Sequence, residues 1–111
     1  MKYYMADGSG AINLHCKIDA GLNGVIADTE IAIHEVRLHL SAASAAEDFV
    51  VKAECPLDGR YDAVFTTKAM NALTDYNYQP YFPHYLRTGD DLVITKANAA
   101  GLTWSVCVVY E

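Results

Sequence analysis

Apolar and polar residues alternate along much of this chain with a period of two, not with the helical period of about 3.6. The first clear example is the segment 11–18, in which Ile12, Leu14, Cys16 and Ile18 share one parity and polar residues occupy positions 13, 15 and 17. Successive side chains of a strand point to opposite faces. This pattern therefore predicts a half-buried β-strand.

A single shift in the alternation falls inside the segment 29–40. Its apolar positions are Ile31, Ile33, Val36, Leu38 and Leu40. The first two are odd-numbered and the last three are even-numbered, so one extra residue must be accommodated between them. A β-bulge inserts one residue into a strand in this way. We predict a long strand with a bulge at His34-Glu35.

Turn-forming residues divide the rest of the chain into further short strands. Segments 49–54 and 61–67 alternate, and Pro56 to Gly59 supplies a turn between them, which predicts a hairpin. The last two strands, 92–97 and 102–110, are separated by turn residues and are predicted to pair as a closing hairpin.

The number and spacing of these segments predict an all-β fold. About seven to eight strands at intervals of about eight to twelve residues, without intervening helices, are typical of an antiparallel β-sandwich, here jelly-roll-like. The 111 residues contain no linker and no internal repeat, so we expect one domain over residues 1–111. Residues 1–10, which end in Gly8-Ser9-Gly10, are predicted to form a flexible N-terminal arm.

Composition narrows the functional classes. Apolar residues make up 52% and charged residues 20% of the chain, which excludes a disordered protein and leaves apolar surface for a partner. Eight basic and fourteen acidic residues give a net charge of −6, which disfavours nucleic acid and anionic membranes as partners. No segment has the length of about eighteen apolar residues that a spanning helix needs.

The three cysteines, Cys16, Cys55 and Cys107, are odd in number and widely spaced. They match neither a disulfide framework nor a CxxC metal or redox motif. The N-terminus has one lysine and no apolar run of signal-peptide length. We therefore expect reduced thiols in a protein made and folded in the cytoplasm.

Candidate catalytic groups are few. His34 and His39 resemble the zinc-binding pair HExxH, but they are five residues apart instead of four, and on a strand they point to opposite faces unless the bulge reunites them. Asp90-Asp91 could bind calcium or act as paired carboxylates, although a turn capped by aspartate is the simpler interpretation. No serine or cysteine lies in a nucleophile motif. We expect no enzyme activity, no metal and no cofactor.

Aromatic residues form the better functional candidate. The segment 76–85 is interrupted by Pro80 and Pro83, which place it near a sheet edge. Alternation puts Tyr76, Tyr78 and Phe82 on one side. Such rings could close one end of the sandwich, contact a neighbouring subunit or stack on a sugar. The candidate interface or ligand surface consists of Tyr76, Tyr78, Tyr81, Phe82, Tyr85 and Trp104.

Trp104 belongs to a strand with apolar residues on both faces. Val106 and Val108 share its parity, and Cys107 and Val109 lie on the other face. A strand of this kind needs cover on both sides. One cover is the opposite sheet, and we expect the other to be a neighbouring subunit.

The order of segments from residue 30 to residue 111 resembles a group of small structural proteins of tailed bacteriophages. The matching pieces are residues 35–40, 47–51, 61–62, Gly89-Asp-Asp-Leu-Val-Ile94, Asn98 and Gly101-Leu-Thr-Trp104. The first twenty residues lie outside the resemblance. It implies a jelly-roll module that assembles on the virion as a capsid decoration, fibre or neck component, and it brings no catalytic residues.

These observations lead to one main hypothesis and two alternatives. The main hypothesis is a non-enzymatic virion structural protein, most simply a capsid decoration or head-associated protein, that forms a homo-oligomer, with a trimer favoured, and binds virion proteins such as the major capsid protein. One alternative is a carbohydrate-binding module that uses Tyr76, Tyr78 and Tyr81. The other is a small metal-dependent enzyme around His34, His39 and an acid.

Overall fold

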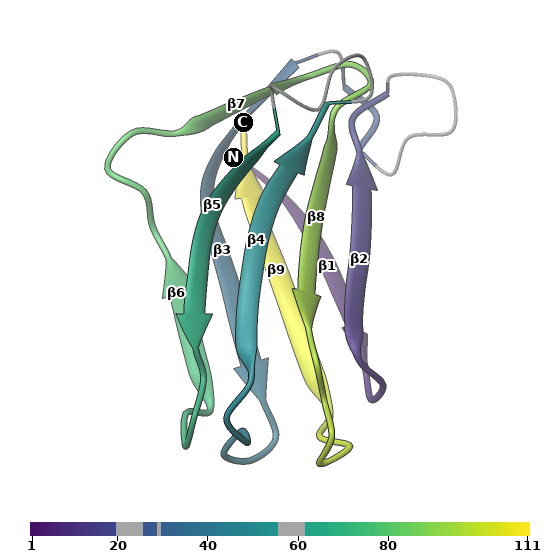
Figure 1. Cartoon of the computed structure of the whole chain (residues 1–111). Helices are drawn as coiled ribbons and strands as arrows, with labels where there is room; N and C mark the ends of the chain where they lie inside the picture. The colour runs from purple at the N-terminus through teal and green to yellow at the C-terminus, as the bar shows by residue number, and fades with distance from the viewer. Residues whose placement is uncertain (20–25, 29, 56–61) are drawn as a thin grey trace.

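The computed structural model describes residues 1–19, 26–28, 30–55 and 62–111. These residues form nine β-strands in two antiparallel sheets that face each other as a sandwich (Figure 1). The strands are β1 (Lys2–Gly8), β2 (Ile12–Lys17), β3 (Glu30–Leu40), β4 (Asp48–Glu54), β5 (Ala63–Ala69), β6 (Asp75–Tyr78), β7 (His84–Arg87), β8 (Asp91–Lys96) and β9 (Trp104–Tyr110). The expected all-β sandwich is confirmed, with nine strands in place of seven to eight.

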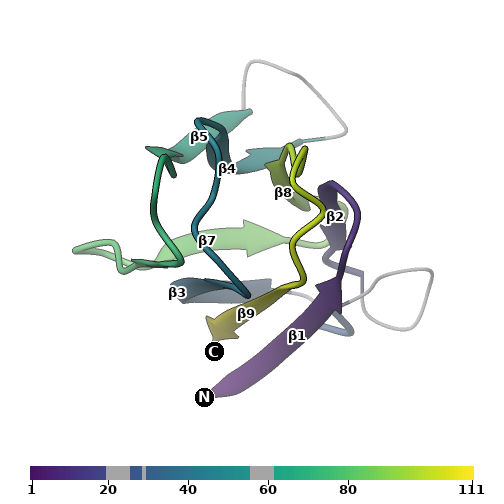
Figure 2. The same cartoon turned by 90° about the horizontal axis from the view of Figure 1, so that it is seen from below.

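The order of the strands is that of a jelly roll. Sheet A runs β1-β9-β3-β6, with β7 also paired to β3, and sheet B runs β2-β8-β4-β5. Strands β6 and β7 share one position, because β6 pairs with residues 36–39 of β3 and β7 with residues 30–33. If β6 and β7 are counted as one strand, number 6, then β8 becomes strand 7 and β9 becomes strand 8. The two sheets then have the strand orders 1-8-3-6 and 2-7-4-5, which is the double Greek key of a jelly roll. Figure 2 shows the two layers from below.

The predicted bulge in β3 is confirmed. Ile33 lies opposite Tyr110 of β9 and Glu35 lies opposite Val109, so His34 is the extra residue. The shift lets the apolar residues on both sides of it face the same interior. All of them are at most 1% exposed, namely Ile31, Ile33, Val36, Leu38 and Leu40.

One predicted hairpin is correct and the other is wrong. Strands β4 and β5 pair as expected, and the predicted turn between them falls on residues 56–61, outside the described residues. The closing hairpin does not form: β8 lies between β2 and β4 in sheet B, whereas β9 lies between β1 and β3 in sheet A. The connection between them crosses from one sheet to the other.

Asn98 holds this crossing in place. Its Nδ2 donates to the carbonyl oxygens of Ser9, Gly10 and Leu102 at 3.1, 3.0 and 2.8 Å, and its Oδ1 accepts from the amide of Leu102 at 3.0 Å. One side chain thus joins the β1–β2 turn to the β8–β9 connection. The sequence indicated only a turn at Asn98, whereas in the fold its side chain connects two turns by hydrogen bonds.

The N-terminal segment also differs from the prediction. Residues 2–8, expected to belong to a flexible arm, form β1, which pairs with β9 over its whole length. Its inward side chains, Tyr4 and Ala6, pack against the core.

In the described parts of the chain, no helix is long and apolar enough to cross a membrane.

Candidate functional site

The aromatic cluster divides into an inner and an outer part. Tyr76 and Tyr78 of β6 lie opposite the buried Leu38 and Val36 of β3, so they face the interior. The Tyr76 ring meets Phe49 edge-on, with 6.1 Å between ring centroids. These two tyrosines therefore close one side of the sandwich, the first of the three roles expected for the cluster.

His84 completes this closure. Its ring stacks on Phe65 of β5, with 3.9 Å between centroids and 2° between planes, and its Nε2 lies 2.7 Å from the Tyr78 hydroxyl. Burial lowers the pKa of His84 below its ordinary value and raises that of Tyr78. The contact links β6 and β7 of sheet A to β5 of sheet B. No motif in the sequence marked His84 for this position.

The outer part of the cluster is almost fully exposed. Tyr81 is 92% exposed, Phe82 74% and Tyr85 68%. We call these three residues the aromatic loop. Tyr81 and Phe82 lie on the chain that leaves β6 and swings away from the sheets (Figure 1), and Tyr85 is the second residue of β7. Phe82 does not share the inward side of Tyr76 and Tyr78, because β6 ends at Tyr78 and alternation stops with the strand.

The rings of Tyr81 and Phe82 do not form one flat surface. The rings of Tyr81 and Phe82 are 4.7 Å apart at 83° to each other. A sugar ring stacks on a flat aromatic surface, whereas this pair presents two perpendicular rings. Large exposed rings with a polar tip are enriched at protein interfaces.

A second apolar surface lies on the outer face of sheet A. Tyr3 and Met5 of β1 are 58% and 71% exposed, and they stand opposite Val109 and Cys107 of β9. We call these four residues the apolar strip. Val109 is only 6% exposed, so its neighbours within the sheet already cover it. The strip is the outer apolar face expected for β9, extended by two residues of β1 that the prediction of an arm had missed.

Tyr3 and Met5 could have been found from the sequence. The signal is the pair Tyr3-Tyr4, a residue type enriched in strands, although residues 3–6 are all apolar or aromatic and lack the alternation of the other strands. The prediction of an arm rests instead on Gly8 and Gly10, which follow this segment.

The rest of the outer face of sheet A carries paired charges. Arg37 donates to both carboxylate oxygens of Glu35 at 2.8 and 3.1 Å, and this contact holds the pKa of Glu35 below its ordinary value. His39 Nδ1 lies 2.5 Å from Asp75 Oδ1, and hydrogen bonds from His39 and Thr74 lower the pKa of Asp75. Glu35 and Arg37 stand opposite Val109 and Cys107, so their ion pair borders the apolar strip.

The two histidines of the predicted zinc-like pair contact different carboxylates. His34 Nε2 lies 3.3 Å from Glu111 Oε2, without hydrogen-bond geometry, whereas His39 pairs with Asp75. Among the described residues, no three His, Cys, Asp or Glu side chains are grouped as metal ligands would be. The structure thus does not bring His34 and His39 together.

Trp104 belongs to the interior rather than to a surface. It is 8% exposed, and its Nε1 donates to the carbonyl oxygen of Gly10 at 2.8 Å. The six residues of the predicted surface are therefore divided: Tyr76, Tyr78 and Trp104 face inward, and Tyr81, Phe82 and Tyr85 face outward.

The three cysteines and the pair Asp90-Asp91 were the remaining candidates for chemistry in the sequence. All three cysteines are free thiols, and burial raises the pKa of Cys16 to about 12. Asp90 Oδ2 accepts from the amide of Arg87 at 2.9 Å, which confirms the turn interpretation. Asp91 Oδ2 lies 2.8 Å from His15 Nδ1.

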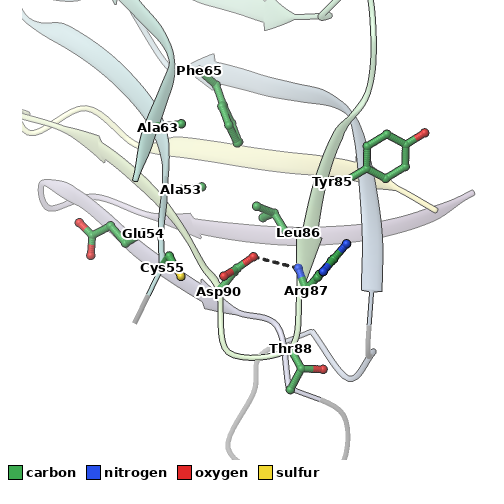
Figure 3. A pocket seen from close by; sticks show the side chains of 10 residues that line it. All are labelled: Ala53, Glu54, Cys55, Ala63, Phe65, Tyr85, Leu86, Arg87, Thr88 and Asp90. Carbon is green, nitrogen blue, oxygen red and sulfur yellow. Dashed lines mark hydrogen bonds between the residues drawn. The ribbon is translucent and has the colours of Figure 1, made fainter. Parts of the chain in front are cut away.

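A cleft of about 450 Å³ opens between β4, β5 and β7 (Figure 3). Its lining combines apolar residues with three charged ones, Glu54, Arg87 and Asp90. The volume is within the range of small-molecule sites, about 300–1,000 Å³. The lining residues Cys55 and Ala63 flank the undescribed segment 56–61, so we assign no ligand to the cleft.

Comparisons with known proteins show no family for this chain. No protein-family model matches the sequence, and no curated protein matches it. Among solved structures, the Drosophila NLP core, studied for pentamer formation and histone binding, aligns over 100% of this chain and 99% of its own with 12% identity and a TM-score of 0.49. A chain of the Gx strain of infectious bursal disease virus aligns over 96% of this chain and 30% of its own, with 17% identity and a TM-score of 0.36. Neither likeness carries a functional argument.

Proposed function

We propose that this protein is a non-enzymatic structural component of a bacteriophage virion, a capsid decoration or head-associated protein that self-associates and binds other virion proteins. The observation that carries the proposal is the exposed apolar surface, concentrated in the apolar strip and the aromatic loop. The order of segments that resembles phage structural proteins supports the assignment to a virion.

The exposure of these side chains is the physical reason for expecting partners. Contiguous apolar surface on a soluble domain is costly in water and marks sites of association. The strip and the loop are two separate surfaces at opposite edges of sheet A, and they contain Tyr3, Met5, Tyr81, Phe82 and Tyr85, each more than half exposed. Tyrosine, phenylalanine and methionine are the residue types enriched at protein interfaces.

Two measurements test the proposal. Mass spectrometry of purified particles of the encoding phage is expected to detect the chain at a constant ratio to the major capsid protein. Light scattering on the purified protein is expected to give a multiple of the monomer mass of 12.2 kDa, and the multiple distinguishes a dimer from the trimer favoured by the sequence. A strict monomer at high concentration that is also missing from particles would overturn the proposal.

Paired variants test the aromatic loop as a contact with another virion protein. The double variant Tyr81→Ala/Phe82→Ala is expected to reduce incorporation into particles, because both rings lie outside the folded core. Val64→Ala is the matched control, since Val64 is an apolar side chain of sheet B that is 62% exposed. Equal incorporation of the two variants would show that the loop is not the contact.

Carbohydrate binding is the alternative function. It would depend on the aromatic loop, since Tyr76 and Tyr78 face the interior. A glycan array probed with the protein and with Tyr81→Ala tests it: a glycan bound by the first and not by the second would favour the alternative.

A further inference from the structure

The edges of the two sheets differ in how they are protected. In sheet A the edges are β1 on one side and β6 with β7 on the other, and in sheet B they are β2 and β5. An edge strand presents unpaired N–H and C=O groups that pair readily with another chain. Proteins that remain monomeric interrupt such edges with bulges, prolines, short strands or charged residues.

Three of these edges carry such interruptions. The β4–β5 pairing shifts register, because Thr66 lies opposite Val51 but Val64 lies opposite Lys52, so β5 bulges at Phe65. Strands β6 and β7 have four residues each and are separated by a segment with two prolines. The outward side chains of β2 are all polar: Asn13, His15 and Lys17.

Strand β1 has the fewest of these protections, because its charged residues, Lys2 and Asp7, lie near its two ends. Its seven residues pair with β9 in one continuous register, from Lys2 opposite Tyr110 to Gly8 opposite Trp104. It contains no proline, and two of its three outward side chains, Tyr3 and Met5, are apolar. Among the described edges, β1 is thus the long and regular one, and it borders the apolar strip.

We propose that β1 pairs antiparallel with β1 of a second copy of this chain, about a two-fold axis at Met5. The inference rests on the self-association proposed above and specifies where it occurs. It joins two copies of sheet A into one continuous sheet. A two-fold contact builds dimers, in place of the trimer favoured by the sequence.

The register follows from the strand itself. Residues directly opposite in an antiparallel pair point to the same face. In β1 the odd-numbered side chains point outward and the even-numbered ones inward, so odd residues must pair with odd ones and even with even, and the two numbers add up to an even number. Of these registers, only the one centred on Met5 pairs all seven residues of β1, since Met5 is the middle residue of Lys2–Gly8.

The side chains of β1 are complementary in this register. Met5 lies opposite its own copy, Tyr3 opposite Asp7, Tyr4 opposite Ala6 and Lys2 opposite Gly8. No two like charges face each other, and the large inward Tyr4 meets a small residue. On the outward face, the two apolar strips become neighbours across the axis, which buries the exposed Met5.

Two variants that place opposite charges at Met5, on the two-fold axis, test the proposal. In Met5→Lys two lysines would face each other, and in Met5→Glu two glutamates would do so. Each variant alone is therefore expected to lose the dimer under conditions in which the wild type is dimeric. An equimolar mixture is expected to form the mixed dimer, detected by native mass spectrometry and weakened by salt. This rescue is specific for a contact in which residue 5 faces its own copy.

Two controls separate association from folding. Val64→Lys places the same charge on an exposed apolar residue of β5 and is expected to leave the dimer unchanged. Circular dichroism of the Met5 variants is expected to match the wild type, because Met5 is 71% exposed.

The remaining outcomes each overturn a defined part of the proposal. A wild-type dimer that persists in Met5→Lys would place self-association elsewhere, and loss of the dimer without rescue in the mixture would exclude the register centred on Met5. A monomeric wild type that is nevertheless present in purified particles would refute the β1 contact and leave the virion role standing.

Discussion

The indole of Trp104 lies directly against Gly8, its partner in the register of β9 and β1. A Cβ atom added to Gly8 would stand 2.8 Å from Trp104 Cζ2, closer than carbon atoms approach each other in folded proteins. The same indole donates its N–H to the carbonyl oxygen of Gly10. One side chain of the last strand thus fixes the end of the first strand and the turn that follows it.

This contact predicts that Gly8→Ala destabilises the fold. The added methyl group must displace the indole or the backbone of β1, at a cost of about 1–3 kcal/mol in the free energy of unfolding. Denaturant titration measures it. Gly10→Ala is the control, because no atom lies within 4 Å of the added Cβ, and it is expected to change stability by less than about 0.5 kcal/mol. Equal stability of the two variants would contradict the close packing at Gly8.

Asn98 offers a second test, on the connection between the sheets. Asn98→Ala leaves three carbonyl oxygens and one amide without their partner, and we expect a loss of about 1–3 kcal/mol in the free energy of unfolding. Asn98→Asp keeps the acceptor but not the donor, so it should recover little of the loss. The exposed Asn77→Ala is the control, expected to unfold at the wild-type denaturant concentration.

Lys96 at the end of β8 forms an ion pair with Glu47, which lies between β3 and β4. Removing one partner of this pair is expected to destabilise the fold more than removing the other. Lys96 Nζ donates to Glu47 Oε1 and to the carbonyl oxygen of Ala97, both at 2.9 Å, and the Lys96 side chain is 1% exposed. Glu47→Ala would leave this buried ammonium without a counter-charge, whereas Lys96→Met leaves a carboxylate that still accepts from the Ala99 amide. We expect Glu47→Ala to have the lower unfolding midpoint, and the reverse order would contradict the role of the pair.

The same carboxylate predicts a loss of stability in acid. The Ala99 amide and then Lys96 hold the pKa of Glu47 below its ordinary value of 4.5. Its contribution is therefore complete above pH 4.5 and is lost as the pH falls through the lower value of the folded state. Denaturant midpoints measured between pH 6 and pH 3, in steps of about half a unit, are expected to fall less steeply in Glu47→Gln than in the wild type.

His84 predicts a separate change closer to neutral pH. Burial lowers its pKa below the ordinary value of 6.5, so the unfolded state takes up the proton first as the pH falls. Stability is therefore expected to decrease from pH 6.5 downward, through the lower pKa of the folded state. In His84→Phe, which keeps a ring against Phe65 but cannot titrate, this decrease should be absent. His15→Phe, at an exposed position of β2, is the control and should retain it.

Much of the fold could be predicted because its determinants are local. The period of two marks strands wherever one face is buried, and the change of parity between Ile33 and Val36 located the bulge of β3 without coordinates. Phe49 and Val51 showed in the same way which face of β4 lies inside. These features depend on a few neighbouring residues, so the sequence was sufficient for them.

Pairing between strands could not be predicted in the same way. Strands β8 and β9 are consecutive and separated by turn residues, as in a hairpin, yet they belong to opposite sheets. What decides this is the contact of Asn98 with the β1–β2 turn, almost ninety positions away. Local pattern contains no information about such a partner.

The candidate surface shows the same division. The sequence by itself determined that the chain alternates, that β9 is apolar on both faces and that tyrosines and prolines gather before β7. Only the tertiary structure decided that Tyr78 faces His84 inside while Tyr81 lies in solvent, and that Met5 belongs to an edge strand beside Cys107. The physical reason is that parity assigns a side chain to a face, but whether that face is covered depends on strands distant in the sequence.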